Sequence, residues 1–221
     1  MSEHKLFAGD VPFVSTAAFH AHRERAPHLE QPVHQPRLYK AAEYVRRSVL
    51  QHIKGCEGPS RNCVPFPVSD LGCGDGGLLS LLTGLPSIGV RVEAWGYDFQ
   101  PSNVDGWKAR GVKAEQLDVF GADRDQAVLG LTTVVTEVLE HLADPHGAVR
   151  WIGEHSQFIV ASSPWNETPE SHDECHAWAW DQAGYRALIE QGGFTIRRHE
   201  TVGQFQVILG EREGHPACAS S

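Results

Sequence analysis

A glycine-rich turn at residues 68–77 constrains this chain more than any other feature. The turn reads Val-Ser-Asp-Leu-Gly-Cys-Gly-Asp-Gly-Gly; the apolar residue Phe66 precedes it, and the leucine-rich run Leu78–Leu82 follows it. Glycine permits positive φ angles and a close approach of the backbone to a ligand, and the leucine run is typical of the packed face of a helix. A strand, a glycine turn and a helix start in this order predict a doubly wound α/β fold, in which ligands bind in the crevice at the carboxyl ends of the parallel strands.

The spacing Asp70-x-Gly72-x-Gly74 differs from the G-x-G-x-x-G pattern of dinucleotide-binding turns. A pyrophosphate favours bare backbone N–H groups at a helix N-terminus, and an adjacent acid would repel it. A cationic ligand with an amino-acid tail would instead be attracted by Asp70 and Asp75. This stretch alone also leaves open a plain glycine turn that joins a strand to a helix.

Two further acids follow apolar segments in the order that a doubly wound sheet requires. The segment Val90–Asp98 alternates apolar and polar residues and ends on an acid, which we expect at the tip of the neighbouring strand. A carboxylate at that position can accept both hydroxyls of a ribose. The segment Ala114–Val119 carries Asp118 in the corresponding place on a third strand.

The glycine turn and the ordered acids resemble the first motifs of class I S-adenosylmethionine-dependent methyltransferases. The resemblance implies S-adenosyl-L-methionine as the cofactor and a mostly parallel seven-stranded sheet that closes with a C-terminal antiparallel hairpin. The strands expected near Phe194–Arg198 and Gln204–Leu209 would form that hairpin. The cofactor-binding residues implied by the resemblance are Asp70, Gly72, Cys73, Gly74, Asp98, Phe99, Asp118, Val119 and Glu137. Among them, the resemblance implies that Asp118 binds the adenine amino group.

The segment Leu131–Glu137 is rich in β-branched residues and is predicted to be the fourth strand, whose tip faces the transferable methyl group. Its continuation, Glu137–Pro145, resembles the E-x-x-E-H-x-x-D-P stretch of ubiquinone-type small-molecule O-methyltransferases. That family usually opens the strand with an acid, whereas this chain has Leu131-Thr132. The resemblance implies transfer of a methyl group to a small-molecule acceptor, with a hydroxyl as the favoured nucleophile.

The catalytic residues expected for this reaction are His141 and Glu137. The sulfonium is already activated, so the protein has to align donor and acceptor and accept a proton. A histidine near the fourth strand tip titrates close to neutral pH and suits that role. The alternative is a structural histidine that Glu137 or Glu140 stabilises.

A divalent metal is a second possibility at the same junction. The two carboxylates Glu137 and Glu140 precede His141, and His176 follows on a downstream segment. This pattern also resembles the metal-dependent 2′-O-methyltransferases that act on the 3′ ends of small RNAs. Two further alternatives are a non-catalytic methyltransferase-like scaffold subunit and a nicotinamide-linked oxidoreductase.

The chain is expected to form one methyltransferase domain over residues 36–212. Residues 1–35 would be an N-terminal tail or a substrate cap, and residues 213–221 a flexible tail. The stretch Gly121–Gly130 is expected to be helical. The segment Trp165–Trp180 is dense in aromatic residues and long for a loop, which favours a substrate lid whose tryptophans line the acceptor site.

Composition limits the partners and the compartment. The 221 residues carry a formal net charge of −9 and no long run of basic residues, which argues against binding of long nucleic acids. The five cysteines are odd in number and form no C-x-x-C pair, as is typical of a reducing compartment. No stretch approaches the ~20 apolar residues of a membrane span. We therefore expect a soluble cytoplasmic enzyme with a small-molecule acceptor.

Overall fold

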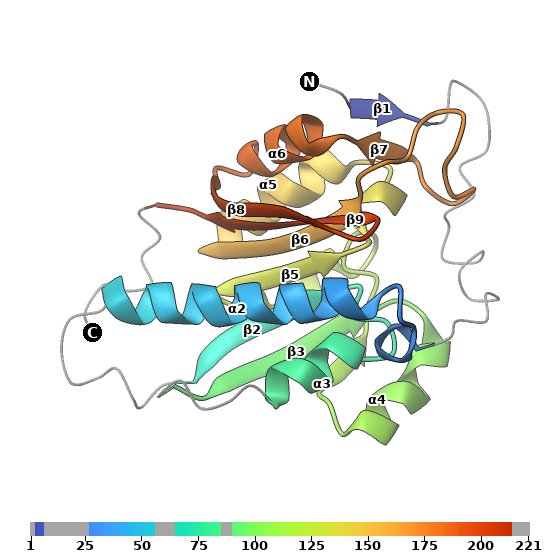
Figure 1. The fold of residues 1–221 in the computed structure, drawn as a ribbon. Helices are drawn as coiled ribbons and strands as arrows, with labels where there is room; N and C mark the ends of the chain where they lie inside the picture. Colours follow the sequence, from blue (N-terminus) through green and yellow to red (C-terminus); the bar gives the residue numbers. More distant parts are fainter. Residues whose placement is uncertain (1–2, 7–26, 56–64, 85–89, 214–221) are drawn as a thin grey trace.

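The structure is a computed structural model, and it describes residues 3–6, 27–55, 65–84 and 90–213. Its central feature is a seven-stranded sheet in the order β4-β3-β2-β5-β6-β9-β8 (Figure 1). The first five strands of that order are parallel to one another. The strand β9 runs antiparallel to both of its neighbours, β6 and β8. Their bounds are Ala114–Gln116 for β4, Val92–Asp98 for β3, Phe66–Leu71 for β2, Thr132–Thr136 for β5, Phe158–Pro164 for β6, Phe205–Glu211 for β9 and Thr195–Val202 for β8. The predicted fold class is confirmed.

Helices cover both faces of the sheet, and each face has its own hydrophobic core. The helices α2 (Gln35–Gly55), α3 (Gly77–Thr83) and α4 (Val104–Arg110) contribute to one cluster, around Val45, Leu79 and Trp107. The helices α5 (Pro145–His155) and α6 (Gln182–Glu190) contribute to the other, around Ile152 and Leu188. Since both faces are covered, the central strands are buried on both sides, as β-strands of parallel sheets generally are.

The strand β2 lies at the point where the strand order reverses. It pairs with β3 on one side and with β5 on the other. Ligands of doubly wound folds bind in the crevice beyond the carboxyl ends of strands at such a point. The sheet therefore brings the glycine turn after β2 next to the ends of β3 and β5.

The stretch Gly121–Gly130 is not the helix that its composition suggested. Only the 3₁₀ turn Arg124–Gln126 forms there. The carboxylate of Asp123 accepts hydrogen bonds from the backbone N–H of Asp118 and from the side chain of Gln126. Aspartate side chains that bond nearby backbone groups stabilise turns in competition with helices.

The N-terminal strand β1 (Glu3–Lys5) pairs antiparallel with β7 (Trp178–Trp180) in a separate two-stranded sheet. The Trp180 indole N–H donates a hydrogen bond of 2.7 Å to the Glu3 carboxylate. The end of the predicted lid is therefore a strand that the beginning of the chain holds in place.

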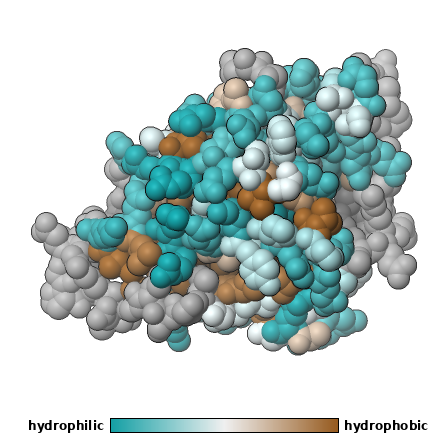
Figure 2. Space-filling model, in the orientation of Figure 1, coloured by the Kyte–Doolittle hydropathy of each residue, from teal (hydrophilic) through white to brown (hydrophobic). Residues whose placement is uncertain are grey.

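The surface drawn in Figure 2 is mostly hydrophilic, and its apolar residues form small separate groups among polar ones. Among the described helices, none combines the length and apolar character that a membrane crossing requires.

Candidate functional site

The glycine turn contains three glycines whose backbone is in the left-handed conformation. Gly72, Gly74 and Gly76 have φ angles of 73°, 54° and 82°. A Cβ atom on Gly72 would collide with the side chain of Val138, whereas one on Gly74 would meet no atom within 4 Å. The turn thus packs tightly against the segment after β5 at Gly72 and is open at Gly74, where a ligand can approach the backbone.

Asp98 fastens this turn to the end of β3, the position predicted for it. One carboxylate oxygen accepts a hydrogen bond of 2.9 Å from the N–H of Gly74, and the other accepts one of 2.8 Å from the N–H of Gln100. The residue is buried. Its carboxylate therefore fixes the conformation of the turn at the place where a ribose is expected.

Asp70 is a buried acid at the end of β2. Burial, followed by the nearby charge of Asp98, raises the pKa of Asp70 to about 8, while the Arg37 charge acts in the opposite direction. One oxygen of Asp70 and the Nε of Arg37 have no hydrogen-bond partner within the described residues. Both residues line a small cavity of about 60 Å³ together with the glycine turn.

Asp75, the second acid that the sequence suggested would attract a cationic ligand, already has a positive partner within the protein. The Arg110 guanidinium donates two hydrogen bonds to one of its oxygens, at 2.6 and 3.0 Å. This pairing satisfies the Asp75 charge within the protein. The positive charge of Arg110 lies far along the chain, so the glycine motif alone gave no sign of it.

Three further residues predicted to bind the cofactor, Phe99, Asp118 and Val119, follow the carboxyl ends of β3 and β4. Asp118 lies two residues beyond the end of β4, and its N–H bonds Asp123. Val119 is buried in the core cluster that includes α5, and the Phe99 carbonyl accepts a hydrogen bond from the Gln116 side chain. These three residues line neither the small cavity nor the large one, and their contact with the cofactor stays a prediction.

A second, larger cavity of about 550 Å³ adjoins the small one. The two cavities share His28 and Glu137. The lining of the larger cavity is polar and rich in imidazoles: His28, Gln31, His34, Glu137, His141, Pro164, Asn166, Glu167, Ser171, His172, Asp173, Cys175, His176, Gln204 and Phe205. His28 and His34 come from the segment predicted to be a tail or a cap, and His141 comes from η5 (Leu139–His141). The wall therefore joins distant parts of the chain.

Glu137 lies between the cavities in a strained backbone conformation. Its φ of 56° makes it the one non-glycine residue with positive φ in the described part of the chain. The Ser162 hydroxyl donates a hydrogen bond of 2.9 Å to its carboxylate. Burial raises the pKa of Glu137, although the Arg37 charge and the Ser162 hydrogen bond oppose the shift. Strain of this kind costs about 1–3 kcal/mol and concentrates at functional sites.

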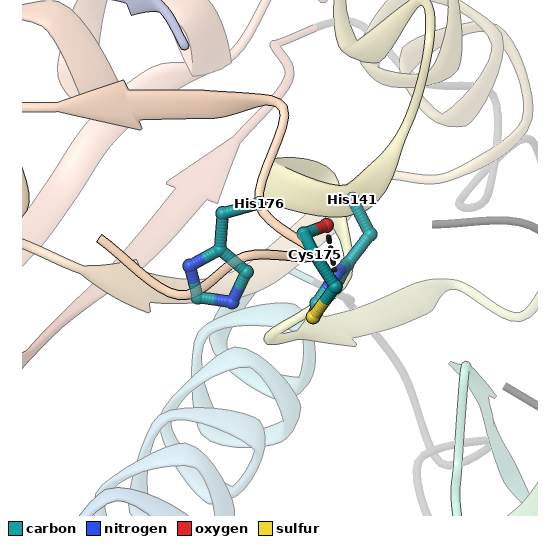
Figure 3. A group of neighbouring side chains, drawn as sticks. All are labelled: His141, Cys175 and His176. Carbon is teal, nitrogen blue, oxygen red and sulfur yellow. Dashed lines mark hydrogen bonds between the residues drawn. The ribbon is translucent and has the colours of Figure 1, made fainter. Parts of the chain in front are cut away.

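The predicted metal group is only partly assembled. His141 and His176 lie edge to face with ring centroids 4.6 Å apart. Cys175 completes a group whose potential ligand atoms lie within 4.8 Å of one another (Figure 3). Glu137 and Glu140 do not belong to this group.

Glu140 points into the protein core instead. The residue is fully buried, and neither carboxylate oxygen has a hydrogen-bond partner within the described residues. Burial, with the Glu137 charge, raises the pKa of Glu140 well above its usual range. The junction after β5 consists of the left-handed residue Glu137, then Val138 and the 3₁₀ turn η5.

The tryptophans of the predicted lid do not line the large cavity. Trp180 is buried in a core cluster, and Trp178 packs against the same cluster. Trp165 is exposed and donates its N–H to the Gly203 carbonyl. Histidines form the wall that we expected tryptophans to form.

Sequence reasoning did not identify several residues of the two cavities: Arg37, His28, His34 and Cys175. One signal was available for Arg37. It lies in the first turn of α2, where the helix dipole disfavours a positive charge. A cation placed against that preference suggests a role in binding or in charge compensation.

The comparisons with known proteins show the fold. No family model matches the sequence, and none of the curated proteins matches it either. Among solved structures, magnesium protoporphyrin IX methyltransferase from Synechocystis PCC 6803 with bound S-adenosylhomocysteine aligns with a TM-score of 0.60 at 14% identity, over 91% of this chain and 97% of that one. An O-methyltransferase family protein from Burkholderia thailandensis aligns with a TM-score of 0.59 at 10% identity, over 83% of this chain and 58% of that one.

A third structure, the N-terminal domain of EvdMO1 in the presence of S-adenosylhomocysteine and D-fucose, aligns with a TM-score of 0.53 at 15% identity. The alignment covers 81% of this chain and 84% of that structure. The sheet order, the glycine turn and these neighbours together define the fold of class I S-adenosylmethionine-dependent methyltransferases. The ubiquinone-type subgroup finds no specific support in these neighbours.

Proposed function

We propose that this protein transfers the methyl group of S-adenosylmethionine to a hydroxyl of a small molecule. The observation that carries the proposal is the position of Glu137, which lines both the small cavity at the glycine turn and the large cavity beside it. A donor in the first cavity and an acceptor in the second would meet at this residue. Solved structures of the same fold contain S-adenosylmethionine or S-adenosylhomocysteine, which supports this cofactor.

The residues of the small cavity fit the amino-acid tail of the donor. That tail carries an ammonium and a carboxylate. The unpaired Asp70 oxygen can accept from the ammonium, and the Arg37 guanidinium can bind the carboxylate. Each buried polar group would then gain the partner that buried groups require. Asp98 would bind the ribose hydroxyls while it holds Gly74.

The reaction requires alignment and one proton acceptor. The acceptor oxygen forms a bond to the methyl carbon as the bond from that carbon to sulfur breaks, and S-adenosylhomocysteine leaves. The hydroxyl proton passes to a base. Glu137 and His141 both line the acceptor cavity. The raised pKa of Glu137 brings its carboxylate closer to the range in which a general base is efficient at neutral pH.

The large cavity favours a small molecule over RNA as the acceptor. Its volume of about 550 Å³ lies within the range of small-molecule sites, about 300–1,000 Å³. Within the described residues its lining contains acids and histidines and no lysine or arginine. Phosphate backbones are bound chiefly through positive side chains, so the RNA alternative has no specific support here.

Calorimetry and methyl transfer test the proposal together. We expect S-adenosylhomocysteine to bind and NAD not to bind. Radiolabelled methyl groups should pass from S-adenosylmethionine to some members of a panel of phenols, sugars and hydroxy acids. The variant Glu137→Gln should still bind S-adenosylhomocysteine but turn over about 10²–10⁴-fold more slowly.

Three outcomes would count against the proposal. Failure to bind S-adenosylhomocysteine would remove the cofactor assignment. Binding without transfer to any hydroxyl compound would favour the scaffold alternative. Full activity of Glu137→Gln would exclude Glu137 as the base and leave His141 in that role.

A further inference from the structure

The group formed by His141, Cys175 and His176 has the composition of a transition-metal site. Its three potential ligand atoms lie within 4.8 Å of one another, and all three residues line the large cavity. Figure 3 shows the three side chains turned toward a common point between η5 and the segment before β7. Cys175 and His176 are buried, and His141 is half-buried.

Each imidazole has one nitrogen occupied by an oxygen acceptor. The Nδ1 of His141 lies 3.1 Å from the Cys175 carbonyl oxygen, and the Nδ1 of His176 lies 2.6 Å from the Glu167 carboxylate. Carbonyl and carboxylate oxygens only accept hydrogen bonds, so both Nδ1 atoms carry the proton. In each neutral ring the lone pair is then on Nε2. This tautomer can bind a metal through Nε2.

The same two contacts are typical of metal-binding histidines. Such residues almost always donate their second N–H to a carboxylate or a backbone carbonyl, which fixes the ring and increases its basicity. Here the partner of His141 is a backbone carbonyl, and the partner of His176 is a carboxylate. The Cys175 sulfur lies 2.9 Å from an Asp173 oxygen, which accepts the thiol hydrogen bond.

The donor set selects the metal. Two imidazole nitrogens and one thiolate suit Zn²⁺, whereas Mg²⁺ and Ca²⁺ require oxygen ligands. Zinc bonds of about 2.0–2.3 Å place tetrahedral ligand atoms roughly 3.3–3.8 Å apart. The observed group would have to contract by at most about 1.5 Å to reach that spacing.

We propose that His141, Cys175 and His176 bind one zinc ion, with the remaining coordination position available to a ligand in the large cavity. Three protein ligands and one exchangeable position are the arrangement of catalytic rather than structural zinc sites. The proposal adds a metal to the acceptor side of the proposed methyltransferase site, but zinc binding itself does not depend on that function. A hydroxyl or thiol bound at the fourth position would have a lowered pKa.

A bound zinc also decides between the two candidate bases. Once the Nε2 lone pair of His141 is on the metal, that imidazole cannot accept a proton, and Glu137 is left to do so. The thiol of Cys175 loses its proton when it becomes a ligand, so zinc binding releases about one proton. Asp173, which accepts the thiol hydrogen bond, is the nearest group that can pass this proton on to solvent.

The test is zinc binding by the metal-free full chain, measured by calorimetry in two buffers of different ionisation enthalpy and by elemental analysis after gel filtration. We expect about one zinc per chain and release of about one proton. The variants His141→Ala, Cys175→Ser and His176→Ala should each weaken zinc binding by more than about 100-fold. Glu167→Gln, which alters only the carboxylate behind His176, should weaken it by about 10–100-fold.

Two matched variants control for the residue types. His172→Ala changes a histidine of the same cavity whose Nδ1 bonds the Thr168 carbonyl, and Cys73→Ser changes a buried thiol in the glycine turn. Both should retain stoichiometric zinc. Cobalt in place of zinc should give a thiolate-to-metal charge-transfer band that disappears in Cys175→Ser, and circular dichroism with thermal unfolding should confirm that each variant is folded.

Absence of stoichiometric zinc from the wild type would overturn the proposal, as would equal zinc affinity in the wild type and Cys175→Ser. If the protein binds S-adenosylhomocysteine but no zinc, only the metal site fails and the methyltransferase function stands. If it binds zinc but no S-adenosylhomocysteine, the reverse holds.

Discussion

The donor side and the acceptor side of the site are built in different ways. On the donor side, the carboxylate of Asp98 holds Gly74, and the glycine turn packs against Val138 through Gly72. On the acceptor side, the wall consists of histidines, acids and a cysteine that come from the segment before α2, from η5 and from the stretch before β7. A backbone turn at the strand ends shapes the first region, to which Asp70 and Arg37 add charged side chains. Converging side chains from distant segments shape the second region.

This difference has a physical consequence for tolerance to change. A ligand that binds to backbone N–H groups needs an unobstructed chain conformation, so one added side chain can prevent binding. A ligand that binds to side chains can lose a single contact and keep the others. Substitutions on the donor side should therefore have larger and more uniform effects than those on the acceptor side.

The largest effect is expected for Gly72→Val. The residue has a φ of 73°, and its new Cβ would collide with Val138. Binding of S-adenosylhomocysteine should become undetectable by calorimetry. The control is Gly111→Val, because Gly111 has a similar φ of 65° but no atom within 4 Å of its added Cβ. Binding that survives in Gly72→Val, or is lost equally in Gly111→Val, would contradict the role given to the turn.

A smaller but still large effect is expected for Asp98→Ala. Hydrogen bonds to charged groups contribute about 1.5–3 kcal/mol each, so loss of one such bond should weaken S-adenosylmethionine binding roughly 10- to 150-fold. Asp118→Ala should cost much less, because its predicted partner is a neutral amine. Asp98→Asn should fall in between, since the amide keeps one acceptor for the Gly74 N–H. Calorimetry that finds equal affinities for wild type and Asp98→Ala would exclude this strand tip as the ribose site.

The same contrast explains what the sequence could and could not predict. The positions of Asp70 and Asp98 at neighbouring strand ends follow from local patterns, because a glycine turn after a strand and an acid after the next strand are near each other in any such sheet. The antiparallel β8 and β9 also followed from alternating residues. Those features were confirmed.

The acceptor side depends on contacts that no local pattern carries. The sequence grouped Glu137, Glu140 and His141 as candidate metal ligands, but after the left-handed residue Glu137 the chain forms a 3₁₀ turn in which Glu140 is fully buried. Cys175 takes a place beside His141 because the segment before β7 crosses η5, with the Ala177 N–H bonded to the Glu140 carbonyl. Only the folded chain brings these groups together.

The buried Asp70 should make the stability of the free protein depend on pH. In the unfolded chain this carboxyl ionises near 4, whereas in the folded chain its pKa is about 8. The folded state therefore binds more protons between these values, and the free energy of unfolding should fall as pH rises, by about 1.4 kcal/mol per pH unit for one fully shifted group. Urea unfolding at pH 6 and 7 should show a smaller decrease in Asp70→Asn than in the wild type. An identical decrease in both would show that Asp70 is not the group responsible.

The smallest effect is expected in the segment Trp165–Trp180. The pairing of β7 with β1 holds its end, and a hydrogen bond of 2.6 Å between His176 and Glu167 crosses it. The part free to move is therefore shorter than the predicted lid. The exposed residues Glu170 and Glu174 offer cleavage sites to a glutamate-specific protease.

Saturating S-adenosylhomocysteine should slow cleavage at these two sites only slightly, because no residue of the segment Trp165–Trp180 lines the donor cavity. Zinc should slow it several-fold, since Cys175 and His176 would become fastened to His141 across the cavity. Cleavage at the exposed Glu213 serves as an internal reference and should not change. If zinc leaves cleavage at Glu174 as fast as in the free protein, this segment is not fastened to His141 through a metal, and the contrast between the two sides of the site loses its support from the lid segment.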